Sequence, residues 1–231
     1  MKLGIMQPYF MPYIGYWQLL AMVDTFVIYD NIQYTKKGWI NRNRFLQNDK
    51  DALFTIPLKK DSDFLDVGKR FLANEFNGSK LLNQLQGGYR KAPFFETVFA
   101  LVASIIRAEQ RNLFDYIHHS IRLTSAYLGI QTPLVVSSSV SIDHSLRGED
   151  KVIALCKAMG ATTYINAIGG QELYSKSSFG AAGITLGFIK TRPLTYQQFG
   201  APFVPNLSII DVMMFNSAES IHAMLSEYDV V

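Results

Sequence analysis

The chain has 231 residues, of which 48% are hydrophobic and 18% are charged. This length fits one large domain or two small ones, and the composition excludes a disordered protein. The formal net charge of +3 is lower than that of most free-standing nucleic-acid-binding proteins.

The first part of the sequence predicts a βαβ unit. A short apolar strand at residues 3–6 leads into a helix at residues 13–23, and a β-branched and aromatic strand follows at residues 25–29. The links are short, so the two strands should be parallel. Residues 53–57 are a third strand candidate. Residues 58–93 are polar and interrupted by glycines, which predicts a loop with short helices that could act as a lid. Helices are predicted at residues 94–107 and 113–128.

The second part predicts another βαβ unit, with strands at residues 134–137 and 162–166 around a helix at residues 149–159. A further strand is expected at residues 184–189, and Asn216 to Glu219 have the form of a capping box for a last helix at residues 217–228. The alternation predicts an α/β fold with a parallel or mixed central sheet and a helical insertion around residues 94–128. We find no linker, so residues 1–231 are expected to form one domain, with a possible helical subdomain at residues 58–129.

The bulk features favour a cytoplasmic protein. Cys156 is the single cysteine, which excludes an internal disulfide and suits a reducing compartment. The chain enters a strand at once, so no signal peptide is predicted. The apolar runs are too short to span a membrane, so no membrane insertion is expected. Residues 1–100 hold 13 Lys and Arg against 9 Asp and Glu, which fits an anionic ligand there or a solvated basic face.

The first candidate site is the turn at residues 7–16, between the first strand and the first helix. Pro8 and Pro12 fix φ there, and open α/β sheets bind ligands in such loops. Tyr13 and Tyr16 occupy the places where Rossmann-like nucleotidyltransferases carry the histidines of His-x-Gly-His. A tyrosine can donate a hydrogen bond to an anion but does not readily take a proton. Gln7, Tyr13 and Tyr16 are candidate substrate ligands; the alternative is an aromatic staple between helix and sheet.

The second candidate segment, residues 30–44, follows the second predicted strand and should lie beside that turn. Arg42 and Arg44 point the same way in extended chain, where they could clamp a phosphate or carboxylate. Trp39 could stack on a sugar or base. A charged surface loop is the alternative. The candidates in this segment are Asp30, Gln33, Tyr34, Trp39, Asn41, Arg42 and Arg44.

The third and fourth candidates follow strands of the second βαβ unit. The serines at residues 137–141 and Lys151 stand before and within the start of a helix, a place that binds anions, although plain helix capping is the alternative. Asn166 ends a strand, and the glycines after it permit a close turn. Ser208 and Asp211 are explained by helix capping and the helix dipole. No metal site is predicted, because the histidines are isolated or adjacent and no cysteine pair exists. The candidates here are Ser138, His144, Lys151, Asn166 and Tyr174.

Taken together and in order, these segments resemble the WbqC-like protein family over nearly the whole chain. The family often occurs in bacterial surface-polysaccharide gene clusters, so the resemblance implies the addition of an acyl or aminoacyl group, such as glycine, to an amino sugar. It brings no secure assignment of catalytic residues. The segments that carry it are Gln7–Pro8, Pro12–Tyr16, Asp30–Tyr34, Asn41–Asn43, Gly148–Lys151, Tyr164–Asn166, Gly169–Gly170, Leu173–Tyr174 and Leu207–Asp211.

The leading hypothesis is a transferase of O-antigen-type polysaccharide synthesis that forms an amide on a nucleotide-linked amino sugar. The acyl donor stays open among a coenzyme A thioester, a carrier protein, an aminoacyl-tRNA and an ATP-activated acid. One alternative is nucleotidyl transfer with ATP, and another is a non-catalytic sugar-nucleotide-binding protein. No cofactor and no oligomeric state are assigned. In the leading hypothesis phosphates meet Arg42, Arg44 and Lys151, the base is Asp30 or His144, and the oxyanion is steadied by Asn41, Asn166 or Ser138.

Overall fold

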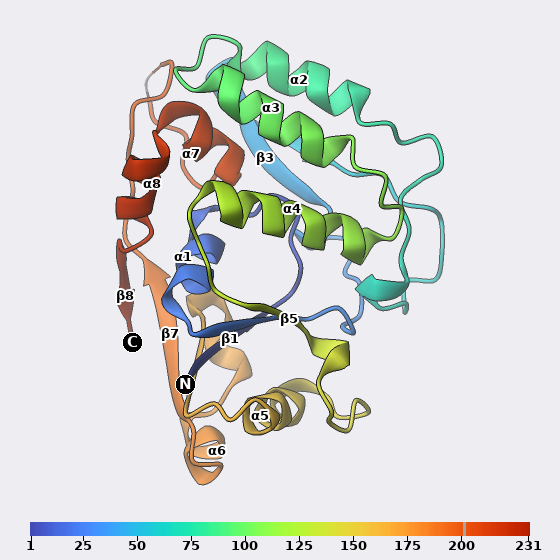
Figure 1. The fold of residues 1–231 in the computed structure, drawn as a ribbon, viewed down its shortest axis with the longest axis vertical. Coiled ribbons are helices and arrows are strands. Elements are labelled where there is room, and N and C mark those ends of the chain that lie inside the picture. Colours follow the sequence, from blue (N-terminus) through green and yellow to red (C-terminus); the bar gives the residue numbers. More distant parts are fainter. Residues whose placement is uncertain (201) are drawn as a thin grey trace.

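The computed structural model describes residues 1–200 and 202–231, and its centre is a six-stranded sheet in the order β5-β2-β1-β6-β7-β8 (Figure 1). The first five strands in this order are parallel, and β8 pairs with β7 in the antiparallel sense. The predicted α/β fold with a parallel or mixed sheet is therefore confirmed. The strands are β1 (Lys2–Met6), β2 (Thr25–Ile28), β5 (Leu134–Val136), β6 (Thr163–Ala167), β7 (Thr185–Thr191) and β8 (Tyr228–Val230).

The strand order contains a topological switch point. The chain runs outward from β1 through β2 to β5, and then returns to the other side of β1 to form β6 and β7. This is the strand order of doubly wound nucleotide-binding folds. The connections after β1 and β6 leave the sheet in opposite directions, so a crevice opens at their carboxyl ends, where such sheets bind ligands.

Side chains alternate between two hydrophobic layers along the strands. Leu3 and Ile5 of β1 join the layer of α5 (Gly148–Ala158) and α6 (Lys176–Ala181). Phe26 and Ile28 of β2 join the opposite layer, which includes α1 (Ile14–Met22). Figure 1 shows α5 and α6 below the sheet, and α1, α2, α3 and α4 above it. This two-sided burial explains why the strands read as short apolar runs.

The connection from β2 to β5 carries a large insertion. It contains a hairpin of β3 (Arg42–Gln47) and β4 (Lys50–Thr55), a 3-10 turn at Val67–Lys69, and helices α2 (Ser79–Tyr89), α3 (Phe95–Ile106) and α4 (Leu113–Tyr127). The predicted helices at residues 94–107 and 113–128 are therefore confirmed. The apolar side chains of the insertion belong to the same cluster as Phe26 and Ile28. The insertion and this side of the sheet therefore share one hydrophobic core.

Two elements inside the insertion differ in extent from the predictions. The strand candidate at residues 53–57 is β4 at residues 50–55, and it pairs with β3, a strand that was not predicted and that begins at the end of the second candidate segment. The stretch at residues 58–93, predicted as a loop with short helices, contains the 3-10 turn and the 11-residue helix α2, which has two adjacent glycines near its end. Tertiary packing overrides the low helix propensity of glycine here.

The C-terminal elements also differ from prediction. The last helix, α8 (Ala218–Met224), is shorter than expected, and Tyr228–Val230 pairs with β7 as a strand. Its N-cap is Ser217, whose hydroxyl accepts a hydrogen bond from the backbone N–H of Ser220, one residue later than the predicted capping box. The remaining elements are α7 (Ile209–Phe215) and 3-10 turns at Ser137–Ser139 and Ile168–Leu173.

The glycine pair in α2 offers a matched test of this packing. A Cβ on Gly88 would lie 2.7 Å from the carbonyl oxygen of Leu46 on β3, whereas a Cβ on Gly87 would meet nothing within 4 Å. Gly88→Ala is therefore expected to lower the free energy of unfolding by about 1–3 kcal/mol through overpacking. Gly87→Ala should raise it by about 0.5–1 kcal/mol through helix propensity. Urea denaturation of both variants checks this, and equal effects would mean that α2 does not approach β3 so closely.

Candidate active site

A cavity of about 510 Å³ lies at the switch point, and we call it the switch-point cavity. It is bounded by the carboxyl ends of β1, β2 and β6, by the start of α5, and by the turn after β6. Five predicted residues line it: Gln7, Gln33, Lys151, Asn166 and Tyr174. Other lining residues include Tyr9, Tyr29, Asn31, Arg147, Gly169 and Gly170.

Lys151 is the charged centre of this cavity. It stands in the first turns of α5 and is only 5% exposed. Its Nζ lies 3.4 Å from the carbonyl oxygen of Asn31 and 5.1 Å from the ring centroid of Tyr29. Burial lowers the pKa of Lys151, and no carboxylate of the described residues lies within ion-pair distance of its ammonium. The carboxylates of Asp66 and Asp30 oppose this lowering from farther away. A buried cation beside the N–H groups of a helix start attracts an anion.

Asn166 forms a rigid part of the opposite wall. Its Nδ2 donates to the hydroxyl of Tyr164 at 2.8 Å, and its Oδ1 accepts from the backbone N–H of Ala167 at 2.7 Å. A Cβ on Gly170 would lie 3.1 Å from this Nδ2, so the following turn needs a glycine to fold back so closely. Tyr174 packs edge-on against Tyr164, with ring centroids 5.6 Å apart.

Asp30, Ser138 and His144 lie beside the switch-point cavity and not in its wall. Asp30 Oδ1 accepts from the hydroxyl of Ser137 at 2.8 Å and from the backbone N–H of Ser138 at 2.9 Å. The same Ser137 hydroxyl lies 2.7 Å from Asn31 Oδ1, so its one proton serves either Asp30 or Asn31. Asn31, which lines the cavity, therefore links Asp30 to the ligand space.

Both ring nitrogens of His144 are engaged. Asn31 Nδ2 lies 2.9 Å from Nδ1, and the carbonyl oxygen of Val140 lies 3.0 Å from Nε2. With this orientation of the Asn31 amide, Nδ1 accepts and Nε2 carries the proton. His144 thus has no free lone pair for a substrate proton. Oδ2 of Asp30 makes no hydrogen bond to the described residues, which leaves Asp30 as the better placed of the two predicted bases.

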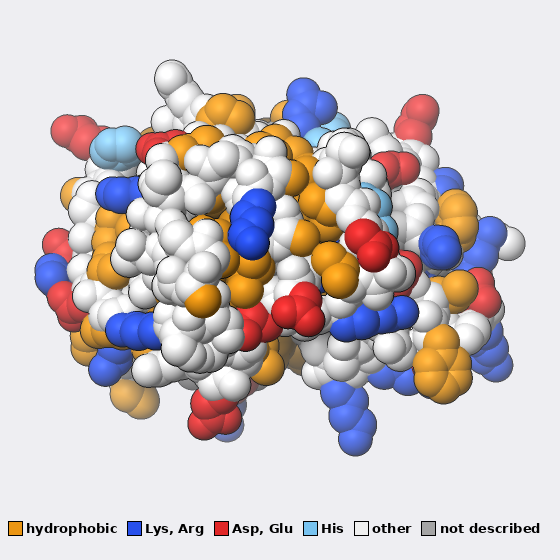
Figure 2. All heavy atoms as spheres, turned by 90° about the horizontal axis from the view of Figure 1, so that it is seen from below, with side chains coloured by type: hydrophobic (Ala, Val, Ile, Leu, Met, Phe, Trp, Pro, Cys, Tyr) orange, Lys and Arg blue, Asp and Glu red, His pale blue; other side chains and the backbone are white. Residues whose placement is uncertain are grey.

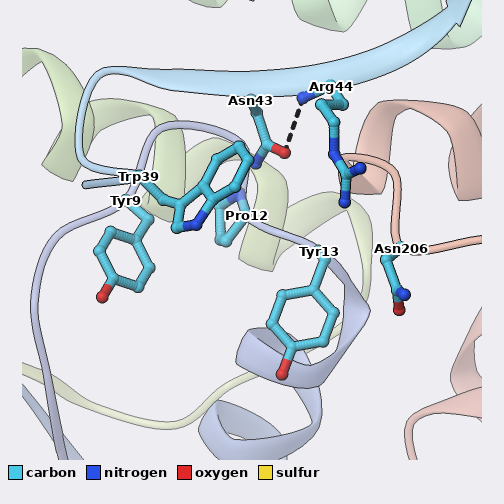
Figure 3. A pocket seen from close by; sticks show the side chains of 7 residues that line it. All are labelled: Tyr9, Pro12, Tyr13, Trp39, Asn43, Arg44 and Asn206. Carbon is cyan, nitrogen blue, oxygen red and sulfur yellow. Dashed lines mark hydrogen bonds between the residues drawn. The ribbon is translucent and has the colours of Figure 1, made fainter. Parts of the chain in front are cut away.

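A second cavity, of about 380 Å³, adjoins the first, and we call it the aromatic cavity (Figure 3). Tyr9 lines both cavities. Figure 3 shows Trp39 over Pro12, with the Arg44 guanidinium reaching down between Tyr13 and Asn206. The lining residues are Tyr9, Pro12, Tyr13, Trp39, Asn43, Arg44 and Asn206.

Arg42 and Arg44 lie on one side of β3, and their guanidinium carbons stand 5.5 and 5.6 Å from the ring centroid of Trp39. Arg42 donates to the carbonyl oxygens of Lys37 and Gly38 and does not line the cavity. Arg44 lines it, and one of its terminal nitrogens lies 3.2 Å from Asp51. Lys151 therefore lines the switch-point cavity, Arg44 lines the aromatic cavity and Arg42 lines neither, although the leading hypothesis grouped them.

The turn that separates β1 from α1 is held by distant segments. Met11 has a positive φ of 48°, which is strained for a residue with a side chain. Its carbonyl oxygen accepts from Asn43 Nδ2 and from Ser208 Oγ, each at 2.7 Å. The next carbonyl oxygen, of Pro12, accepts from the backbone N–H of Ile209 at 2.9 Å. Residues of β3 and of the start of α7 thus fix the shape of this turn.

Tyr16, Tyr34 and Asn41 lie in the interior and line neither cavity. Tyr16 is 2% exposed and packs edge-on against Phe26. Asn41 accepts from the hydroxyl of Tyr34 at 2.8 Å and donates to the carbonyl oxygen of Ile56 at 2.7 Å. The two positions that resemble His-x-Gly-His are therefore split, since Tyr13 borders the aromatic cavity and Tyr16 is core.

Sequence reasoning missed Tyr9, Asn31 and Asn206 as cavity residues. Tyr9 and Asn31 stood in segments already singled out, directly after strands β1 and β2, so their position was a usable signal. Asn206 reaches the aromatic cavity from a turn in which its own φ is 57°. Such a left-handed residue in a long connection cannot be foreseen from the sequence.

Two further findings concern residues 1–200 and 202–231. No helix among them is long and apolar enough to cross a membrane. No group of three or more His, Cys, Asp or Glu side chains among them is placed to hold a metal ion. On the face seen in Figure 2, basic and acidic side chains of the described residues are interspersed, without one broad basic patch.

The fold and the cavity define a class: a doubly wound α/β protein with a cavity at its switch point. The sequence profile of the WbqC-like protein family matches residues 7–223, and the chain belongs to that family. It is also similar to the uncharacterized protein Rv1507c of Mycobacterium tuberculosis, with 28% identity over 224 residues and coverage of 95% of each chain. No solved structure matches the chain.

Proposed function

We propose that the protein is a cytoplasmic enzyme of bacterial surface-polysaccharide synthesis that forms an amide on a nucleotide-linked amino sugar. The observation that carries this proposal is the switch-point cavity, which combines a buried cation, a helix start and several amide side chains. The cation and the helix N–H groups suit a diphosphate. Carboxamides and tyrosine hydroxyls suit the hydroxyl groups of a sugar.

In this proposal Lys151 binds the phosphates, while Gln7, Gln33 and Asn166 line the part that holds the sugar. The amine attacks the acyl carbonyl, a C–N bond forms, and the donor's leaving group departs with the electron pair of its bond to the acyl carbon. Asp30 takes the amine proton through one water, because its Oδ2 is free while the ring nitrogens of His144 are engaged. The acyl donor stays open among the four classes named above.

The alternative of nucleotidyl transfer is less well supported. It needs the side chains of both Tyr13 and Tyr16 to contact the phosphates of ATP. Tyr16 is packed in the core and cannot do so. The alternative of a non-catalytic sugar-nucleotide-binding protein differs from the proposal only in turnover, so the experiment must measure turnover.

The test is incubation of the protein with a UDP-linked sugar that carries a free amine and with each donor class in turn. Mass spectrometry should find the amide product with one of the donors. Calorimetry should detect binding of the sugar nucleotide to the protein. Asp30→Asn is expected to keep sugar-nucleotide binding within about twofold and to lose about 100-fold or more of the rate. Binding without product from any donor class would favour a binding protein, and no binding would overturn the proposal.

A further inference from the structure

The aromatic cavity is not used by the proposed binding of a sugar nucleotide. It holds Trp39, a large hydrophobic side chain that is 43% exposed, on the loop before β3. An exposed indole that borders a cavity offers a face for a planar ring. Tyr9 and Tyr13 border the same space, so a ring that enters it meets aromatic surface on more than one side.

Arg44 and Asn206 add polar groups that have capacity left for a ligand. The Nε of Arg44 is buried and has no hydrogen-bond acceptor among the described residues. This N–H is closed off from solvent, so the part of Arg44 left for a ligand is Nη2, which makes no hydrogen bond to the described residues. The Asn206 amide makes no hydrogen bond to the described residues, and its strained φ of 57° presents it at the cavity. A guanidinium beside an indole face suits an anion attached to a ring.

We propose that the aromatic cavity is a second substrate site, which binds a planar heteroaromatic ring carrying a phosphate, that is, a nucleotide moiety. Trp39 stacks on the ring, Arg44 binds the phosphate, and Asn206 bonds the edge of the ring. Such a moiety comes from a free adenine nucleotide or from coenzyme A. This inference rests on the proposed function in one respect: the moiety belongs to the acyl donor.

The junction of the two cavities places the reacting ends of the two ligands. Tyr9 lines both cavities, and its hydroxyl donates to Gln7 Oε1 at 3.2 Å. A sugar nucleotide in the first cavity and a donor in the second would therefore meet beside Tyr9. Burial raises the pKa of Tyr9, which keeps the phenol neutral and able to donate a hydrogen bond.

The test uses tryptophan fluorescence and calorimetry with AMP and coenzyme A as probes. Trp39 is exposed and the other tryptophan, Trp17, is fully buried, so a stacking ligand should quench Trp39. Adenosine and ribose 5-phosphate, each of which lacks one half of AMP, should bind at least about tenfold more weakly. Stronger binding of coenzyme A than of AMP would identify the thioester as the source, and the reverse order would identify a free nucleotide.

Four variants separate this site from the first one. Trp39→Leu and Arg44→Met should each weaken AMP binding about tenfold or more. Lys151→Met should leave it unchanged, as should Arg122→Met, a matched control on the exposed face of α4. Thermal melts confirm that each variant is folded.

The outcomes distinguish the two proposals. AMP binding that survives Trp39→Leu and is lost in Lys151→Met would overturn the second site and leave the proposed function standing. If the sugar nucleotide binds and neither AMP nor coenzyme A does, the second site is likewise overturned and the proposed function stands. AMP binding that depends on Trp39 and Arg44, with no binding of the sugar nucleotide, would support the second site and overturn the proposed function.

Discussion

Replacement of Asp211 by alanine is expected to lower the free energy of unfolding by about 3–5 kcal/mol. Asp211 is fully buried at the start of α7. It accepts from the hydroxyls of Tyr89 and Tyr196 at 2.8 and 2.7 Å and from Gln198 Nε2 at 2.8 Å. The alanine variant leaves the hydroxyls of Tyr89 and Tyr196 without their acceptor, and Gln198 Nε2 keeps only the carbonyl oxygen of Val204. Asp211→Asn, which keeps one acceptor oxygen, should cost about 1–2 kcal/mol.

Urea denaturation followed by circular dichroism measures these changes, with Glu109→Ala on an exposed loop as a control that should change stability by less than about 0.5 kcal/mol. Burial raises the pKa of Asp211 above its usual 3.8. The native state therefore binds more protons than the unfolded state between 3.8 and the raised value, so this carboxyl makes stability fall as pH rises through that window. The Asp211→Asn variant should lack that fall of stability with pH. If Asp211→Ala left the free energy of unfolding almost unchanged, the hydrogen-bonded cluster around Asp211 would not form.

Lys151→Met is expected to change binding and stability in opposite directions. Without its cation the switch-point cavity should bind a nucleotide-linked sugar about 10- to 100-fold more weakly. The ligand-free variant should be about 1–2 kcal/mol more stable, because a buried charge without an anionic partner is replaced by an apolar side chain of similar length. Calorimetry and urea denaturation measure the two quantities on the same preparation.

The pH dependence gives an independent check of the same residue. The pKa of Lys151 is lowered by burial from its usual 10.5. Between the lowered value and 10.5 the unfolded state binds more protons than the native state, so stability rises with pH across that range. The methionine variant should lack this rise. If Lys151→Met destabilised the protein and spared binding, Lys151 would be a structural residue and not a phosphate ligand.

The predictable parts of this fold are those in which local pattern and tertiary context agree. Strands β1, β2, β5, β6 and β7 were recognisable because burial on both sides makes them apolar runs. Strand β3 was not predicted because Arg42, Asn43 and Arg44 make its first half polar. The bounds of helix α2 were not predicted because Gly88 serves contact with β3, which a single sequence does not display.

The candidate site could be predicted in part for a related reason. Asn166 and Lys151 follow strand ends or begin a helix, and topology alone brings such positions to one edge of a sheet. Trp39 and Arg44 lie inside the insertion, whose path over the sheet depends on long-range packing. In the sequence, Asp211 looked like an ordinary acid in the first turn of a helix. Its hydrogen-bond partners could not be predicted, because Tyr89 is distant along the chain and Tyr196 and Gln198 lie in the long loop before α7.

The hydrogen bonds that hold Met11 have a consequence for synthesis of the protein on the ribosome. Asn43 and Ser208 complete the turn after β1, and Gln18 of α1 donates to the carbonyl oxygens of Met224 and Glu227. The turn after β1 can therefore reach its final shape only after Ser208 has been synthesised, and α1 only after Glu227. Contacts so distant along the chain are slow to form, so these early residues remain incompletely folded while the residues between them are made.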